Sequence, residues 1–136
     1  MLKSVSVNTR AFLLAIVALT ALSFSANAQT PLGGYSAFIG TEDLYNSSGT
    51  RLKDAVQILR QDRANVHRFG IVHPNDEKDP WFFQPEARAA MEGMFRNGGG
   101  IPASIQRAIL QGNVPVYVTI YTEDGNFVAL TVDIPG

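Results

Sequence analysis

The sequence predicts a small α+β domain, and three observations carry this prediction. Residues 54–69 and 85–96 repeat apolar residues at helical spacing, and residues 114–134 alternate apolar and polar residues around a turn. A lone hairpin is only marginally stable, so its apolar face must pack on the helices. We therefore expect one long central helix and two shorter helices on a small antiparallel sheet formed by a C-terminal hairpin.

The first 28 residues have the features of a secretory signal peptide. Lys3 and Arg10 form a basic start, residues 11–22 are apolar, and residues 26–28 (Ala-Asn-Ala) match a small-residue cleavage pattern. The apolar run is shorter than the roughly 20 residues that a membrane-spanning helix needs. We expect cleavage after this motif and export of the mature chain, periplasmic or secreted. An uncleaved N-terminal anchor is the alternative.

The mature chain has the length and charge of one small globular protein. We expect residues 29–34 to form a loose leader and residues 35–136 a single domain. Without Lys3 and Arg10, nine basic residues face 12 acidic ones, and this mild acidity gives no general attraction to nucleic acid or anionic lipid. The absence of cysteine excludes disulfides and thiolate metal sites. No further apolar run is long enough to span a membrane.

Local signals place the first elements. Tyr35–Ile39 alternates weakly and can add an N-terminal third strand. Thr41–Leu44 forms one helical turn, in which two acids favour the positive end. Asp54 followed three residues later by Gln57 is a capping-box pattern, which starts the long helix, and Gly70 ends it.

Prolines and glycines divide the middle of the chain. Residues 71–80 contain two prolines and cannot form a continuous helix. Pro85 stands at a typical first helical position and opens a helix to about Arg96. A third, short helix runs from about Pro102 to Leu110.

The C-terminal hairpin can take either of two registers. A two-residue turn at residues 124–125 would pair Tyr121 with Val128 and put the apolar sets of the two strands on opposite faces. A three-residue loop at residues 123–125 pairs Ile120 with Val128 and aligns both sets. We predict the three-residue loop.

Asp62 interrupts the apolar stripe of the long helix. The apolar members of this stripe are Ala55, Ile58, Leu59, Val66 and Phe69. A carboxylate among them must be paired, hydrogen-bonded or protonated, because burying it bare is too costly. Asp62 is therefore a candidate catalytic acid or base with a raised pKa. We expect instead a structural role, in which it ties the helix to a loop or to an arginine.

Both histidines and the acidic loop are candidate metal ligands. His67, His73, Asp76 and Asp79 offer the nitrogen and oxygen atoms that zinc accepts, and His67 is also a candidate catalytic residue. Their spacing matches neither HExxH nor an EF-hand loop. We therefore expect no metal and no other cofactor, and an acidic loop folded onto the basic side of the helix. The sequence leaves open whether residues 73–80 are ordered.

Two groups of residues are candidates for a recognition surface. The first is the basic side of the long helix, formed by Arg60, Arg63 and His67. The second is Trp81 and Phe82 at the loop-to-helix junction, which either staple the loop to the core or, if exposed, anchor a partner. The outer face of the hairpin, with Tyr117 and Phe127, is a further patch.

No motif with specific catalytic geometry is present. There is no G-x-S-x-G, and the glycines at residues 98–100 lack the lysine of a phosphate-binding loop. We therefore expect an exported, non-catalytic domain that binds a protein or a small ligand in the cell envelope. The alternative is a small exported hydrolase or metal-dependent protein that uses Asp62, His67 and His73. The sequence does not indicate the oligomeric state.

Overall fold

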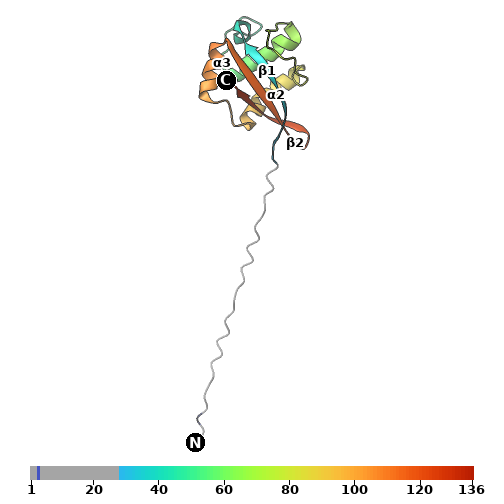
Figure 1. The fold of residues 1–136 in the computed structure, drawn as a ribbon, viewed down its shortest axis with the longest axis vertical. Coiled ribbons are helices and arrows are strands. Elements are labelled where there is room, and N and C mark those ends of the chain that lie inside the picture. The colour runs from blue at the N-terminus through green and yellow to red at the C-terminus, as the bar shows by residue number, and fades with distance from the viewer. Residues whose placement is uncertain (1–2, 4–27) are drawn as a thin grey trace.

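The α+β prediction is confirmed in the computed structural model, which describes Lys3 and residues 28–136. The expected signal peptide lies outside these residues, apart from Lys3 and Ala28. Within the described part of the chain, no helix is both long and apolar enough to cross a bilayer. The elements are β1 (Thr30–Ile39), the 3-10 turn η1 (Thr41–Leu44), α1 (Ala55–Ala64), the π-helical segment η2 (Asn65–Phe69), α2 (Pro85–Asn97), α3 (Ala103–Gln111), β2 (Val114–Glu123) and β3 (Asn126–Asp133) (Figure 1).

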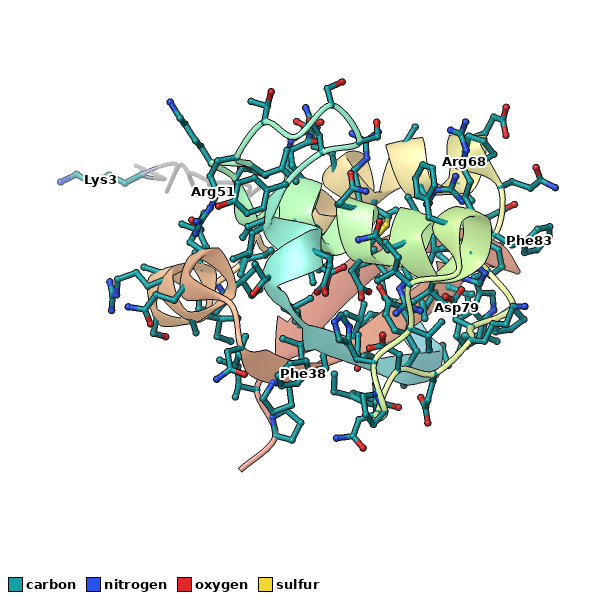
Figure 2. The ribbon with its side chains drawn as sticks, turned by 90° about the horizontal axis from the view of Figure 1, so that it is seen from above. Lys3, Phe38, Arg51, Arg68, Asp79 and Phe83 are labelled. Carbon is teal, nitrogen blue, oxygen red and sulfur yellow. The ribbon has the colours of Figure 1, made fainter. Side chains whose placement is uncertain are left out.

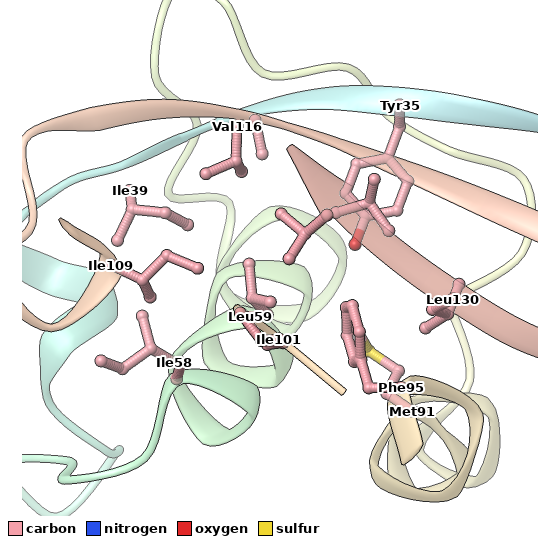
Figure 3. Close-up of a cluster of buried hydrophobic side chains, with 14 of the residues drawn as sticks. Tyr35, Ile39, Ile58, Leu59, Met91, Phe95, Ile101, Ile109, Val116 and Leu130 are labelled. Carbon is pink, nitrogen blue, oxygen red and sulfur yellow. The ribbon is translucent and has the colours of Figure 1, made fainter. Parts of the chain in front are cut away.

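The fold has two layers, with the helices on one face of a three-stranded sheet (Figures 2 and 3). The sheet is antiparallel in the order β1-β2-β3, so β1 and β3 are its edge strands. Helix α2 packs on β3, and α1 contacts α2, α3 and β1. The core between the layers is apolar, and its buried side chains include Tyr35, Ile39, Ile58, Leu59, Met91, Phe95, Ile101, Ile109, Val116 and Leu130 (Figure 3).

The helix expected over residues 54–69 consists of α1 followed directly by η2. Asp54 caps its start by accepting a hydrogen bond from the Gln57 N–H at 3.0 Å. The wider π-helical turn changes the direction of the side chains that follow it. Val66 is still buried within this turn, but Phe69 at its end is 44% exposed, so the assignment of Phe69 to the apolar stripe is wrong. Gly70 ends the segment in the left-handed conformation.

Strand β1 is longer than predicted. It begins at Thr30 rather than at Tyr35, so it includes most of the segment expected to be a loose leader. Four of residues 30–34 pair with β2, and Leu32 is skipped where the register shifts between Pro31 and Gly33. An edge strand accommodates a proline, since one side of its backbone needs no partner strand. Proline and glycine in this segment therefore mark an irregular edge strand rather than a leader.

The hairpin turn differs from the predicted three-residue loop. Asp124 and Gly125 form a two-residue turn, and both have positive φ angles, 50° and 78°, as a type I′ turn requires. The predicted pairing of Ile120 with Val128 is also wrong: the pairing skips Val128 in a β-bulge, so Ile120 lies opposite Leu130. The bulge supplies the extra residue that we assigned to the loop, and it aligns the apolar sets of both strands.

Two alanine substitutions in and after α2 test how closely this helix packs on β3. A Cβ atom at Gly98 would lie 2.0 Å from the backbone oxygen of Leu130, whereas a Cβ atom at Gly93 meets nothing within 4 Å. We expect Gly98→Ala to lower the free energy of unfolding by about 1–3 kcal/mol. Gly93→Ala, the control, should raise it by roughly 0.5–1 kcal/mol through helix propensity. Urea unfolding measures both, and equal stability of the two variants would contradict this packing.

Candidate functional site

The side chain of Arg63 is completely buried and joins three parts of the fold. Its Nε donates to Asp62 Oδ2 at 2.7 Å within α1. Its Nη1 donates to the Glu77 backbone oxygen and to Asp79 Oδ2, both at 2.8 Å, in the loop that follows η2. The ring of Tyr35 from β1 lies with its centroid 4.2 Å from the guanidinium carbon. This arrangement fixes the loop between the helix layer and the sheet.

Asp79 organises the loop through both of its carboxylate oxygens. Oδ2 also lies 2.8 Å from Nε2 of His67, and Oδ1 accepts hydrogen bonds from the backbone N–H groups of Trp81 (2.8 Å) and Phe82 (2.6 Å). Burial raises the pKa of Asp79, but the hydrogen bonds from His67, Arg63 and the two backbone groups outweigh burial and lower this pKa. Asp79 lies well inside the domain, whereas Phe83 stands at its rim (Figure 2).

Asp62 is buried beside its neighbour in the sequence, Arg63, and only its Oδ2 atom is engaged. Oδ1 has no hydrogen-bond partner among the described residues. Burial raises the pKa of Asp62 to about 7 against the opposing charge of Arg63, and the carboxylates of Asp43 and Asp76 add to the increase. For Arg63, burial lowers the pKa, but the adjacent Asp62 and the other groups around it raise it above its usual value.

His73 belongs to a second cluster. Its Nε2 lies 3.1 Å from Glu42 Oε2, its Nδ1 lies 3.2 Å from Asp76 Oδ2, and Asp43 Oδ2 is 3.9 Å from Nδ1. Partial burial lowers the pKa of His73, but the hydrogen bond to Glu42 and the charges of Asp43 and Asp76 outweigh it and raise the pKa. Because both ring nitrogens face carboxylate oxygens, the protonated imidazole can donate to η1 and to the loop at once, which we call the cationic bridge.

Carboxylates also cover the free edge of β1. Two alternate backbone N–H groups of this strand, and that of Gly40 directly after it, donate to side-chain oxygens outside the sheet. The pairs are Ser36 with Glu77 (2.7 Å), Phe38 with Asp76 (2.7 Å) and Gly40 with Asp43 (2.8 Å). In return, the backbone N–H of Glu77 donates to the Ser36 carbonyl at 2.9 Å. These bonds hold the loop of residues 73–80, whose order the sequence does not predict, in place along the edge strand.

The four candidate metal ligands fall into two separate clusters. His67 contacts Asp79, and His73 contacts Asp76. In residues 3 and 28–136, no group of three or more histidine, cysteine or acidic side chains is arranged to hold a metal ion. Nor does any hydrogen bond or ion pair of these residues join Asp62 to either histidine.

The expected basic surface of the long helix is largely absent, which corrects the sequence interpretation. The side chains of Arg63 and His67 are only 0% and 2% exposed. Their burial is possible because the carboxylate of Asp79 contacts the polar nitrogen atoms of both side chains inside the domain. Phe82 is also buried, at 3% exposed, and staples the loop to the core. Arg60 and Trp81 remain partly exposed, and they line two different pockets.

The first pocket, which we call the aromatic pocket, lies between α2 and the β2–β3 hairpin. Its volume is about 280 Å³. All but one of its lining side chains are apolar, and the lining residues are Trp81, Phe82, Ala87, Ala90, Met94, Ile120, Asn126 and Phe127. Among these lining residues, Phe127 is 53% exposed.

The second pocket, which we call the arginine pocket, lies between α1 and the start of α2. Its volume is about 320 Å³, and it contains Arg60 and Arg88. Arg88 was not among the predicted site residues. Its Nη1 donates to the backbone oxygens of Phe82 and Phe83, both at 3.0 Å. A helical pattern alone does not show that this arginine faces inward, because its partners are backbone atoms of the preceding loop.

One sequence signal could have located Asp79. It precedes Trp81 and Phe82 by two and three residues, which is the spacing at which an aspartate side chain accepts backbone N–H groups.

Comparison with known proteins found no matching family model, no matching curated protein and no matching solved structure. Chemical inference about this chain therefore depends on its own residues.

Replacement of Asp62 tests its structural role. We expect Asp62→Ala to lower the free energy of unfolding by more than about 1 kcal/mol, because the buried Arg63 would lose a charged partner. The control is Asp133→Ala, at an exposed position near the C-terminus, which should change it by less than about 0.5 kcal/mol. Urea unfolding gives both values. An Asp62→Ala variant as stable as the wild type would refute this role.

The His73 cluster predicts a pH-dependent contribution to stability. Because folding raises the pKa of His73, the folded state binds its proton more tightly than the unfolded state does. The stabilisation is full below the unfolded pKa of about 6.5 and is lost as pH rises through the higher folded pKa. We expect the stability difference between wild type and His73→Asn to shrink from about pH 6 to pH 9. A difference that does not vary with pH in urea unfolding would contradict the cationic bridge.

Proposed function

We propose that the protein is an exported, non-catalytic domain that binds a small apolar ligand in the cell envelope. The aromatic pocket is the observation that carries this proposal. Concave sites lined by apolar and aromatic side chains with one or two polar groups are typical of small-molecule binding. Here Trp81 and Phe127 supply aromatic surface, and Asn126 supplies the polar group.

The size of the pocket limits the ligand. A cavity of roughly 150 Å³ is enough for benzene, so about 280 Å³ has room for one or two rings or a short branched chain. The ligand's apolar surface would lie against α2, and one hydrogen-bonding group would reach the amide of Asn126. We therefore propose a neutral or weakly polar molecule of this size.

The histidine and aspartate geometry favours binding over catalysis. A general base must reach a substrate within hydrogen-bond distance. None of Asp62, His67 and His73 lines either the aromatic or the arginine pocket. Instead, His67 is hydrogen-bonded to Asp79 and Asp62 to Arg63, and these contacts hold the loop in place. Among the candidate residues of the hydrolase alternative, Asp62 and His73 have raised pKa values, but neither lines the aromatic or the arginine pocket.

Export is proposed from the sequence of residues 1–28. A mature protein recovered from the envelope or the medium, with Gln29 as its first residue, would support this part of the proposal. Recovery of the uncleaved chain inside the cell would oppose it without affecting the proposal for the pocket.

Binding at the aromatic pocket can be measured with the neutral two-ring dye 1-aminonaphthalene, whose fluorescence shifts to shorter wavelength in apolar surroundings. Trp81 is the only tryptophan and lines this pocket, so energy transfer from it to the dye reports binding to the domain, and the Phe127 variant then locates the site. We expect saturable binding that Phe127→Ala weakens about tenfold, the equivalent of an aromatic contact of about 1.4 kcal/mol.

The matched control is Phe83→Ala. Phe83 and Phe127 are 55% and 53% exposed, but only Phe127 lines the pocket. Phe83→Ala should bind the dye like the wild type. Equal weakening by both substitutions, or no energy transfer at saturation, would contradict the proposed site.

A further inference from the structure

The arginine pocket combines two guanidinium groups with polar side chains and no carboxylate. It lies on the side of α2 that faces α1, whereas the aromatic pocket lies on the side that faces the hairpin. Its volume is about 320 Å³, and it is lined by Asn46, Leu52, Gln57, Arg60, Gln61, Ala64, Pro85 and Arg88. The arginine pocket is therefore polar and positively charged, whereas the aromatic pocket is mainly apolar.

Arg88 lacks a carboxylate partner although it is nearly buried. Only 7% of the residue is exposed, and within the described residues no acidic oxygen lies within 4.0 Å of its guanidinium. Its Nη1 is engaged by two backbone oxygens, whereas Nε and Nη2 donate no hydrogen bond to the described residues. A guanidinium has five N–H donors, so this one retains donors for a ligand.

Arg60 adds a second charge at the same pocket. Its single hydrogen bond within the described chain is a long one, 3.4 Å from Nη1 to Gln57 Oε1, and it has no ion-pair partner there. Burial lowers the pKa of Arg88, and the positive charges of Arg68 and Arg60 lower it further, against the opposing influence of Glu86 and Asp79. The guanidinium groups therefore repel one another in the folded protein.

The start of α2 contributes a positive electrostatic potential at the same place. Pro85, the first residue of this 13-residue helix, lines the pocket, and Gln84 before it provides no side-chain cap. The first N–H groups of a helix lack intrahelical partners and carry the positive end of its dipole. Pro85 has no N–H group, so the helix end adds only its dipole, and the two arginines are the charged donors for an anion in the pocket.

From these observations we infer that the arginine pocket binds a small molecule through its carboxylate or phosphate group. A planar guanidinium donates two parallel hydrogen bonds to either oxyanion, and the bond gains strength from both charges. The amides of Asn46, Gln57 and Gln61 offer hydrogen bonds to the remainder of the ligand. The volume sets the ligand at the size of a small organic acid or a phosphate monoester.

Calorimetric titration of the purified protein with succinate, and separately with inorganic phosphate, tests this inference. We expect saturable binding of at least one of the two, and the tighter one identifies the oxyanion. Arg60→Gln should weaken that binding at least tenfold, because it removes one charged donor group. Arg107→Gln, at an exposed arginine of α3 outside the pocket, is the matched control and should stay within twofold of wild type.

Arg88→Lys provides a second variant, which keeps the charge beside the loop carbonyls but removes the planar fork. It should also weaken binding, and the Nε–Hε resonance of Arg88 in the wild type should shift during the titration.

Equal effects of Arg60→Gln and Arg107→Gln would indicate general screening of charge and overturn the inference, as would the absence of saturation with both anions. Binding of the neutral dye to the aromatic pocket should be the same in Arg60→Gln and wild type, so the two sites can fail independently.

Discussion

The buried guanidinium of Arg63 is the interaction on which the rest of the structure depends. It contacts α1, the loop after η2 and the first strand at once, through Asp62, Asp79 and Tyr35. Breaking a buried ion pair by removing one partner typically costs about 3–5 kcal/mol, because the other charge is left without compensation. The cluster therefore leaves the loop little freedom to take another position.

This constraint extends to both pockets. Asp79 holds the backbone N–H groups of Trp81 and Phe82, so the ion pairs determine where the aromatic side chains lie. The carbonyls of Phe82 and Phe83 then hold Arg88 at the start of α2. In this way one loop, fixed by charges in the interior, positions an apolar surface on one side of α2 and a cationic surface on the other. The proposed binding functions share this single support.

Periodicity and capping predicted much of the fold, because both depend on neighbouring residues. Asp54 and Gln57 lie within one helical turn, and the alternation around Val118 and Ile120 is visible in the sequence itself. The hairpin loop was predicted incorrectly because two devices, a longer loop and a bulge at Val128, produce the same alignment of apolar faces.

The site was less predictable, because burial of a charge depends on what covers it. A helical pattern places Arg63 on a polar face of the helix. That face is buried only because the folded loop, with Asp79 sixteen residues further along the chain, covers it. Arg88 escaped prediction for the same reason, since its partners are backbone carbonyls. By contrast, Asp62 stood out in the sequence because an acid within an apolar stripe requires a partner wherever the loop lies.

The carboxylates along β1 have a consequence for self-association. An open strand edge is a template for another chain, and proteins commonly protect it with charge or cover it. Here a second chain could pair with β1 only by displacing the carboxylates of Asp43, Asp76 and Glu77 from its N–H groups. The displaced negative charges would then lie near the carbonyl oxygens of the incoming chain and repel them. At the opposite edge, Asn97 at the end of α2 donates to the Val128 carbonyl of β3. The two edges of the sheet are therefore protected differently: negative charges cover β1, and a neutral amide from the helix layer covers part of β3.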